Sequence, residues 1–146
     1  MKMSDKDLNQ LGLLYLVGLS RAISSRIRLQ KLVCLNRFEN GEQSPFTFAF
    51  KSHYYGPYSE DLRSATDALV RHGLVKEDVQ LLGDTRYSYS YKLTDAGKKE
   101  LDLHAADEGI KAALAPIHAT VSKYGSLSTE LVVQKAKEVS GLPSIQ

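Results

Sequence analysis

Side chains that could catalyse a reaction or hold a metal are scattered along this chain. The histidines are His53, His72, His104 and His118. None of them forms a pair with the close spacing of helical metal ligands. No serine or cysteine lies in a recognisable nucleophile turn, and the ten glycines are spread over turns and helix ends instead of forming a phosphate-binding loop. The sequence therefore predicts a protein that is not an enzyme and has no metal or cofactor.

Binding is the remaining kind of chemistry, and the distribution of charge indicates where it could occur. The formal net charge of the 146 residues is only +2, too small to indicate a nucleic-acid partner by itself. Residues 21–37, however, carry five basic side chains and no acidic one, whereas residues 93–111 carry three lysines and five acids. Arg28 and Lys31 are three positions apart, so on a helix they share one side. This basic stretch is the strongest electropositive candidate.

Two predicted helices position the basic stretch. The first apolar run of the chain recurs with helical spacing, and Asp5 or Asp7 can cap its start. Ser24 or Ser25 can cap a second helix, which carries the basic residues and runs to about Phe38. The first helix is expected to contribute to the core.

A third helix and a hairpin follow. Ser59 is expected to cap the third helix. The runs 74–82 and 85–93 flank a turn at Gly83, which predicts a β-hairpin, and Thr94 can cap a further helix. This order of helix, hairpin and helix is what a winged-helix domain needs. The predicted fold is therefore mainly α with a small β-hairpin, a winged helix-turn-helix with additional N- and C-terminal helices.

The chain is expected to form one domain. Residues 1–146 are predicted to be a single winged-helix domain, with residues 107–146 as a C-terminal helical extension packed on it. Helices are expected from about Glu108 to Tyr124 and over residues 128–140. Pro116 is expected to kink or divide the first of these helices.

Two groups of tyrosines suggest either stacking or core packing. Tyr54, Tyr55 and Tyr58 surround a Gly-Pro turn. Exposed rings there could support nucleic-acid bases, but burial of the rings, with their hydroxyls reaching water, is favoured. Tyr87, Tyr89 and Tyr91 alternate with polar residues in the second predicted strand, which predicts that they form the packed face of the hairpin.

Four short motifs resemble a known group of proteins. They are Leu29-Gln30-Lys31-Leu32, Tyr55-Gly56-Pro57-Tyr58-Ser59, Tyr91-Lys92-Leu93-Thr94 and Tyr124-Gly125-Ser126-Leu127. In this combination they are similar to the YwgA-like and SocA-like (Panacea) group, and the resemblance covers most of the chain. It implies a winged-helix fold and a regulatory or antitoxin-like role.

The leading hypothesis is a transcriptional regulator that binds double-stranded DNA. The third helix would enter the major groove, and the hairpin would contact the backbone or the minor groove. A homodimer formed through the terminal helices would pair two such units. The candidate DNA contacts are basic: Arg26, Arg28, Lys31, Arg63, Arg71, Arg86 and Lys92.

The alternative is a protein-binding adaptor or antitoxin-like module that docks a partner protein. The third helix carries three acidic residues, Glu60, Asp61 and Asp67. Their carboxylates would face DNA phosphates unfavourably, whereas they suit a docking surface for a protein. The residues alone leave both hypotheses open.

Contact with a membrane is not expected. The longest apolar stretch, residues 11–19, is about half as long as a helix that crosses a bilayer. The N-terminal residues lack the basic start and apolar core of a secretory signal. The sequence thus predicts a cytoplasmic location.

Overall fold

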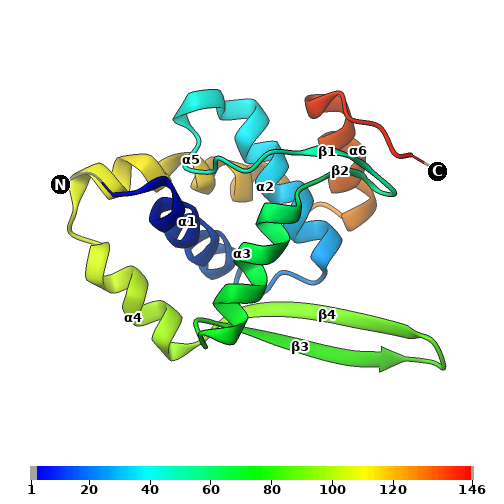
Figure 1. The fold of residues 1–146 in the computed structure, drawn as a ribbon, viewed down its shortest axis with the longest axis horizontal. Coiled ribbons are helices and arrows are strands. Elements are labelled where there is room, and N and C mark those ends of the chain that lie inside the picture. Colours follow the sequence, from blue (N-terminus) through cyan, green and yellow to red (C-terminus); the bar gives the residue numbers. More distant parts are fainter. Residues whose placement is uncertain (1–2, 146) are drawn as a thin grey trace.

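Helices α1 (Asp5–Ser20) and α2 (Arg26–Asn40) form the centre of the fold (Figure 1). The computed structural model describes residues 3–145. The apolar core gathers on these helices, where Leu13, Leu16, Leu32 and Leu35 are buried. Ser4, not Asp5 or Asp7, caps α1: its hydroxyl accepts a hydrogen bond from the Asp7 N–H at 3.1 Å. The two aspartates lie in the first turn instead, where their charges complement the helix dipole.

Helix α2 begins at its serine cap and ends in a short turn. The Ser25 hydroxyl accepts a hydrogen bond from the Arg28 N–H at 2.8 Å. Of the two predicted caps, Ser24 and Ser25, it is therefore Ser25 that caps α2. The 3₁₀ turn η1 (Gly41–Gln43) follows α2. An extended segment then packs Phe46 into the core against α1, where Gly12 leaves room for the ring.

The predicted hairpin around Gly83 is confirmed. Helix α3 (Glu60–Arg71) starts at its Ser59 cap. Strands β3 (Val75–Leu82) and β4 (Arg86–Leu93) pair antiparallel, and their register runs from Val75 opposite Leu93 to Leu82 opposite Arg86. The ribbon extends away from the helices (Figure 1).

Only the base of this hairpin is packed. Tyr91 is 2% exposed, whereas Tyr87, on the same face near the tip, is 60% exposed. The tyrosines of β4 therefore do not form one packed face as predicted. The reason is that the hairpin extends beyond the helices that cover its base, so the ring of Tyr87 near the tip has no apolar layer to pack against.

A third piece of backbone pairs with β4. Ile23, in the joint between α1 and α2, donates its N–H to the Tyr91 carbonyl at 3.0 Å and accepts the Tyr91 N–H at 2.9 Å. Ile23 itself is fully buried. The joint between the first two helices is thus attached to the base of the hairpin.

A second hairpin, which the sequence did not predict, precedes α3. Strand β1 (Lys51–His53) pairs antiparallel with β2 (Gly56–Tyr58). Gly56 turns the chain with φ +93°, a conformation that residues with a Cβ rarely adopt. Ile145 donates its N–H to the His53 carbonyl at 3.0 Å, so this residue lies beside the β1–β2 hairpin.

Helix α4 (Asp95–His104) joins the base of the long hairpin through a tight contact. The Thr94 hydroxyl caps α4 by accepting the Gly97 N–H at 3.0 Å and donates to the Gly73 carbonyl at 2.6 Å. A Cβ added at Gly97 would lie 2.2 Å from the Leu74 carbonyl oxygen. A threonine and a glycine at these two positions therefore let α4 start directly against the first residues after α3.

The last two helices cover the first two. Helix α5 (Glu108–Tyr124) packs on α1 and α2, and α6 (Thr129–Ser140) packs on α2. Helix α5 runs as one element through Pro116, so of the two expected effects the division is wrong, while the kink stays a prediction; burial of Leu114 and Ile117 holds this part of α5 against the core. The described chain is mainly helical with two small antiparallel hairpins.

Candidate binding cleft between the two hairpins

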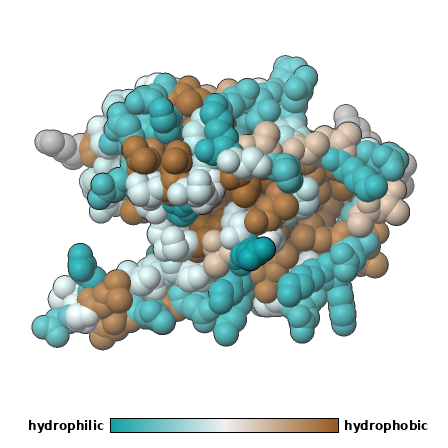
Figure 2. Space-filling view, turned by 180° about the vertical axis from the view of Figure 1, so that it is seen from behind, coloured by the Kyte–Doolittle hydropathy of each residue, from teal (hydrophilic) through white to brown (hydrophobic). Residues whose placement is uncertain are grey.

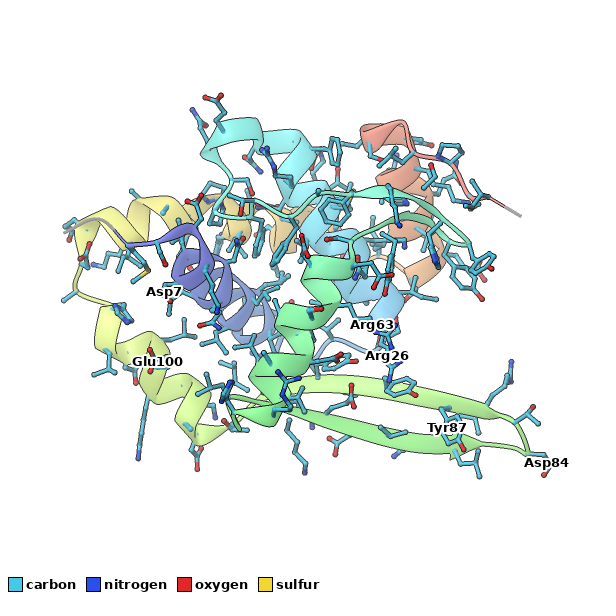
Figure 3. All side chains as sticks on the ribbon, viewed as in Figure 1. Asp7, Arg26, Arg63, Asp84, Tyr87 and Glu100 are labelled. Carbon is cyan, nitrogen blue, oxygen red and sulfur yellow. The ribbon has the colours of Figure 1, made fainter. Side chains whose placement is uncertain are left out.

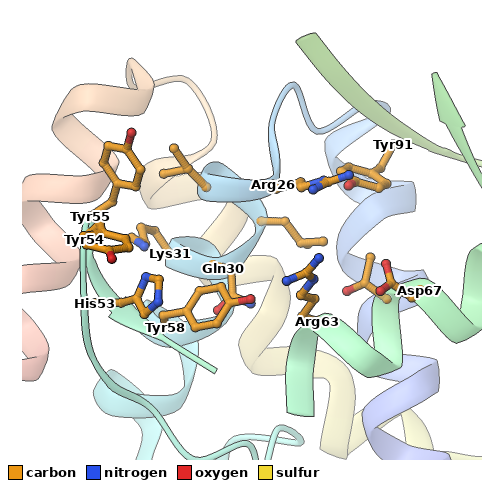
Figure 4. A pocket seen from close by; sticks show the side chains of 13 residues that line it. Arg26, Gln30, Lys31, His53, Tyr54, Tyr55, Tyr58, Arg63, Asp67 and Tyr91 are labelled. Carbon is orange, nitrogen blue, oxygen red and sulfur yellow. The ribbon is translucent and has the colours of Figure 1, made fainter. Parts of the chain in front are cut away.

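A cavity of about 220 Å³ lies between α2, α3, the β1–β2 turn and the base of β4. Figure 4 shows it from close by, and Figure 2 shows, from the far side, the hollow between the projecting ribbon and the rest of the molecule. We call this cavity the cleft. Its lining side chains come from segments that are distant in sequence: Arg26, Ile27, Leu29, Gln30, Lys31, His53, Tyr54, Tyr55, Tyr58, Arg63, Thr66, Asp67 and Tyr91.

Two of the sequence motifs meet at the floor of the cleft. The Gln30 side chain donates to the Ser59 carbonyl at 2.9 Å and accepts the Ser59 N–H at 2.9 Å. Both residues are buried. The side-chain amide therefore satisfies a buried backbone N–H that would otherwise be unpaired, and adds a second donor to a carbonyl that also accepts the Arg63 N–H. This exchange fixes the start of α3 relative to α2.

Lys31 completes this frame. Its Nζ donates to the Pro57 carbonyl at 2.9 Å, and its side chain is 2% exposed. Burial lowers the pKa of Lys31 to about 8, helped by the charge of Lys137, while Cys34 opposes the shift. The amine is thus a buried structural donor, and the surface position expected for it is wrong.

Aromatic rings form one rim of the cleft. His53 stacks on Tyr58 with ring centroids 4.6 Å apart, and Tyr54 meets the His53 ring edge-on at 4.8 Å. Tyr54 is 66% exposed and Tyr55 is 58% exposed, so the core packing predicted for these two rings is wrong. Tyr54 and Tyr55 are themselves the two turn residues between β1 and β2, and strands of only three residues each carry this turn out of the core.

Two arginines point into the cleft from opposite walls. Arg26 comes from the start of α2, and its guanidinium carbon lies 3.7 Å from the centre of the Tyr89 ring. Arg63 comes from α3, where the Tyr58 hydroxyl, followed by the carboxylates of Asp67 and Glu60, raises its pKa. Within the described residues, neither guanidinium has a carboxylate oxygen within 4.0 Å. Figures 3 and 4 show both side chains at the same opening.

Arg28 is not on the basic surface expected for it. Its guanidinium donates to the Gly125 carbonyl at 2.8 Å and to the Thr129 hydroxyl at 3.4 Å, between the end of α5 and the start of α6. It is 9% exposed, and this burial lowers its pKa. The C-terminal helices pack over this side of α2, so Arg28 joins elements of the fold instead of facing a partner.

The remaining basic residues proposed for DNA contact are exposed but do not form one patch. Arg71 lies at the end of α3, Arg86 lies near the hairpin tip, and Lys92 lies near the hairpin base opposite Lys76. The acids of α3 are exposed as well: Glu60 and Asp61 in its first turn, and Asp67 at the cleft. Acidic and basic charges therefore alternate over this helix.

A second cavity, of about 720 Å³, lies between α1, α4 and α5 and differs in its charges. His104 there lies 3.7 Å from the Glu100 carboxylate, and Lys111 lies 3.6 Å from the Glu108 carboxylate. Lys111, a cation at its rim, thus has an acidic partner, unlike Arg26 and Arg63. For this reason we regard the cleft as the candidate site.

Sequence reasoning missed two parts of this site, the pairing of Gln30 with Ser59 and the stacking of His53. A glutamine between apolar helix positions is a signal for the first, because a buried amide requires partners. No local signal indicates the second. Over residues 3–145 no three histidine, cysteine or acidic side chains gather where they could hold a metal ion. Nor does any helix in that range combine the length and the apolar composition that crossing a bilayer requires.

Comparison with known proteins gives one informative likeness. The chain is 34% identical over 83 residues to the uncharacterized protein YwgA of Bacillus subtilis (strain 168). The match covers 57% of this chain and 48% of YwgA, so it spans about half the length of that relative. No family model matches. The likeness to YwgA seen in the motifs is thus supported, whereas the SocA-like (Panacea) relationship stays a prediction.

Proposed function

We propose that this chain is a non-catalytic binding module that takes a segment of a partner protein in the cleft. The observation that carries this proposal is the exposure of Tyr54 and Tyr55 at the rim of a concave surface. Exposed tyrosines and arginines beside a pocket are typical of the residues that dominate protein interfaces. The hydrogen bonds between Gln30 and Ser59 hold this rim in place, which lowers the entropy that binding must overcome.

An adaptor or antitoxin-like role fits this kind of binding. Of the seven basic residues proposed for DNA contact, Arg28 and Lys31 are buried, and the exposed side of α3 carries acids among its arginines. A surface of mixed charge attracts DNA weakly but can be complementary to a protein. The cytoplasmic location and the lack of enzymatic activity stay predictions of the sequence.

Selection of peptides by the full chain tests the proposal. Phage-displayed random peptides should be enriched on the wild-type protein, and the enriched peptides should lose most of their binding to the Tyr54→Ser and Tyr55→Ser variants. Tyr87→Ser at the hairpin tip is the matched control, because it removes a similarly exposed ring outside the cleft. Enriched peptides that bind the two cleft variants as well as the wild type would refute the assigned site.

Binding of double-stranded DNA is the second candidate function, and the Ile23–Tyr91 pairing favours it. With this pairing, the order α1, bridge, α2, α3, β3, β4 agrees with a winged-helix arrangement, in which α3 would be the groove-reading helix. Arg63, Arg71, Arg86 and Lys92 remain exposed to contact bases or phosphates.

A salt titration tests DNA binding. If phosphate contacts carry affinity, log K for a duplex falls linearly with log salt, and the slope becomes shallower by about one for each contact removed. The Arg86→Gln and Lys92→Gln variants should each show this change. No binding at low salt, or an affinity independent of salt, would exclude the DNA hypothesis. Sedimentation of the same samples tests the predicted homodimer.

A further inference from the structure

The lining of the cleft carries more basic than acidic side chains. Arg26, Lys31 and Arg63 line it, and Asp67 is the one carboxylate among its lining residues. Lys31 already donates to the Pro57 carbonyl, whereas the two arginines have no acidic partner within the described chain. Both guanidinium groups are exposed, and without a carboxylate partner their N–H donors can bind an incoming anion.

The geometry of Arg26 leaves its donors available. The face of its guanidinium lies over the Tyr89 ring at 3.7 Å. A guanidinium stacked in this way keeps N–H groups along its edge, and carboxylates bind to that edge in a two-point arrangement. Figure 4 shows the Arg63 guanidinium facing the same space from the opposite wall. Both guanidinium groups thus line the opening through which a carboxylate would enter.

The size of the cleft limits what else can enter. Pockets for drug-sized ligands measure roughly 300–1,000 Å³, and the cleft measures about 220 Å³. It thus suits one large side chain and not a whole ligand of that size. The apolar part of the lining, from Ile27 and Leu29 to the rings of Tyr58 and Tyr91, matches an aromatic or large aliphatic group.

We propose that the partner segment is an acidic peptide that inserts one aromatic or large aliphatic side chain into the cleft and places a neighbouring carboxylate between Arg26 and Arg63. This proposal rests on the protein-binding function proposed above. The carboxylate belongs either to an aspartate or glutamate side chain or to the end of the partner chain, since both present the same two oxygens.

Two acids of α3 limit the affinity. Asp67 lines the cleft one helical turn after Arg63, and Glu60 lies near Arg63 on the preceding turn. Both repel an incoming carboxylate. Replacing Glu60 by glutamine should therefore tighten the binding of an acidic peptide, while the binding of its neutral counterpart should stay unchanged.

Small peptide probes observed by NMR test the proposal on the full-length protein. The side-chain arm compares acetyl-Phe-Glu-amide with acetyl-Phe-Gln-amide. The chain-end arm compares N-acetyl-phenylalanine with N-acetyl-phenylalaninamide. In at least one arm the acidic probe should bind about tenfold more tightly than its neutral partner, the difference expected for a charge-assisted contact. The shifted amide signals should be those of residues that line the cleft.

Matched variants assign the effect to the two arginines. Arg26→Gln and Arg63→Gln should remove the preference for the acidic probe while weak binding of the neutral probe remains. Arg71→Gln, an exposed arginine of the same helix outside the cleft, should keep the preference. Equal binding of acidic and neutral probes, or shifts outside the cleft, would overturn the proposal.

The peptide selection separates this inference from the function on which it rests. Enriched peptides that need Tyr54 and Tyr55 but carry no acid would refute the acidic segment and keep the binding function. Absence of any enriched peptide would refute both. Enriched peptides that pair an aromatic or large aliphatic residue with an acid and lose affinity in Arg26→Gln would support both.

Discussion

Gln30 and Ser59 exchange two hydrogen bonds of 2.9 Å, although they lie 29 positions apart in the chain. The side-chain amide of Gln30 pairs with the backbone of Ser59 in the way that a neighbouring β-strand would. Because Ser59 also caps α3, this single contact orients the helix that forms one wall of the cleft. The motifs around these two residues therefore act as one unit.

Replacement of Gln30 by alanine should lower the free energy of unfolding by about 2–4 kcal/mol. The change leaves the buried N–H of Ser59 without a partner, at roughly 1–3 kcal/mol, and removes one of the two hydrogen bonds that the Ser59 carbonyl accepts, at about 1 kcal/mol. Urea denaturation measures the effect. The matched control is Gln134→Ala on α6, an exposed glutamine, which should change the stability by less than about 0.5 kcal/mol. Similar small losses in both variants would show that the pairing contributes little.

Once Cys34 is replaced, the stability should rise with pH between about 8 and 10.5, and Lys31 should be the cause. Its folded pKa is about 8, below the 10.5 of the unfolded chain, so within this window the unfolded state binds more protons. The cost of burying the charge is fully present below pH 8 and is relieved as the pH rises through the window. The full relief amounts to about 3 kcal/mol at 1.36 kcal/mol per pKa unit.

Cys34 acts in the opposite direction and must be removed from the comparison. Burial raises its pKa from 9.0 to about 12, so its unfolded thiol loses a proton first and stability falls above pH 9. Denaturation of Cys34→Ala and of Cys34→Ala with Lys31→Met, each from pH 7 to 10, isolates the lysine, because all other titrating groups are shared. Parallel pH profiles would show that Lys31 does not titrate in this window.

Gly97→Ala should destabilise the protein, although alanine is the better helix former by about 1 kcal/mol. The new Cβ would lie 2.2 Å from the Leu74 carbonyl oxygen, and a backbone atom cannot easily move away. We expect a loss of about 1–3 kcal/mol, the usual cost of overpacking. Gly109→Ala, the same change in the exposed first turn of α5, should stay within about 1 kcal/mol of wild type. A stabilised Gly97→Ala variant would contradict the close approach.

Arg28 and Arg26 should respond differently to substitution. Arg28→Ala removes the buried donor to the Gly125 carbonyl and should lower the stability by about 2 kcal/mol, since hydrogen bonds to charged groups contribute roughly 1.5–3 kcal/mol. Arg26→Ala removes an exposed contact with Tyr89, for which about 0.5–1 kcal/mol is expected. Thermal unfolding of the two variants measures the difference. Equal effects would place Arg28 on the surface after all.

Local patterns in the sequence predicted most of the elements. Ser25, Ser59 and Thr94 cap helices as their residue types indicate, and the turn at Gly83 joins the long hairpin. These features depend on neighbours within a few residues, so they can be derived from spacing alone. The N-cap of α1 was misplaced because two aspartates and a serine compete within four positions, and only the backbone decides among them.

The cleft could not be predicted from the spacing of residues, because contacts between distant segments form it. Arg28 and Lys31 look like surface cations on an isolated α2, and they are buried because α6 and the Gly56–Tyr58 strand pack on the same side of the helix. Tyr54 and Tyr55 look like core residues, and they are exposed because a short hairpin carries them outwards. Both errors arise from tertiary packing that places distant segments against these residues.

The hydrogen bond from Ile145 to the His53 carbonyl has a practical consequence for binding assays. An affinity tag or a sensor-chip linkage attached after position 145 pulls on the β1–β2 hairpin, which presents Tyr54 and Tyr55. Tension there would loosen the rim and weaken capture of a peptide without any change in sequence. Measurements with the protein tethered by its opposite end, or free in solution, avoid this artefact.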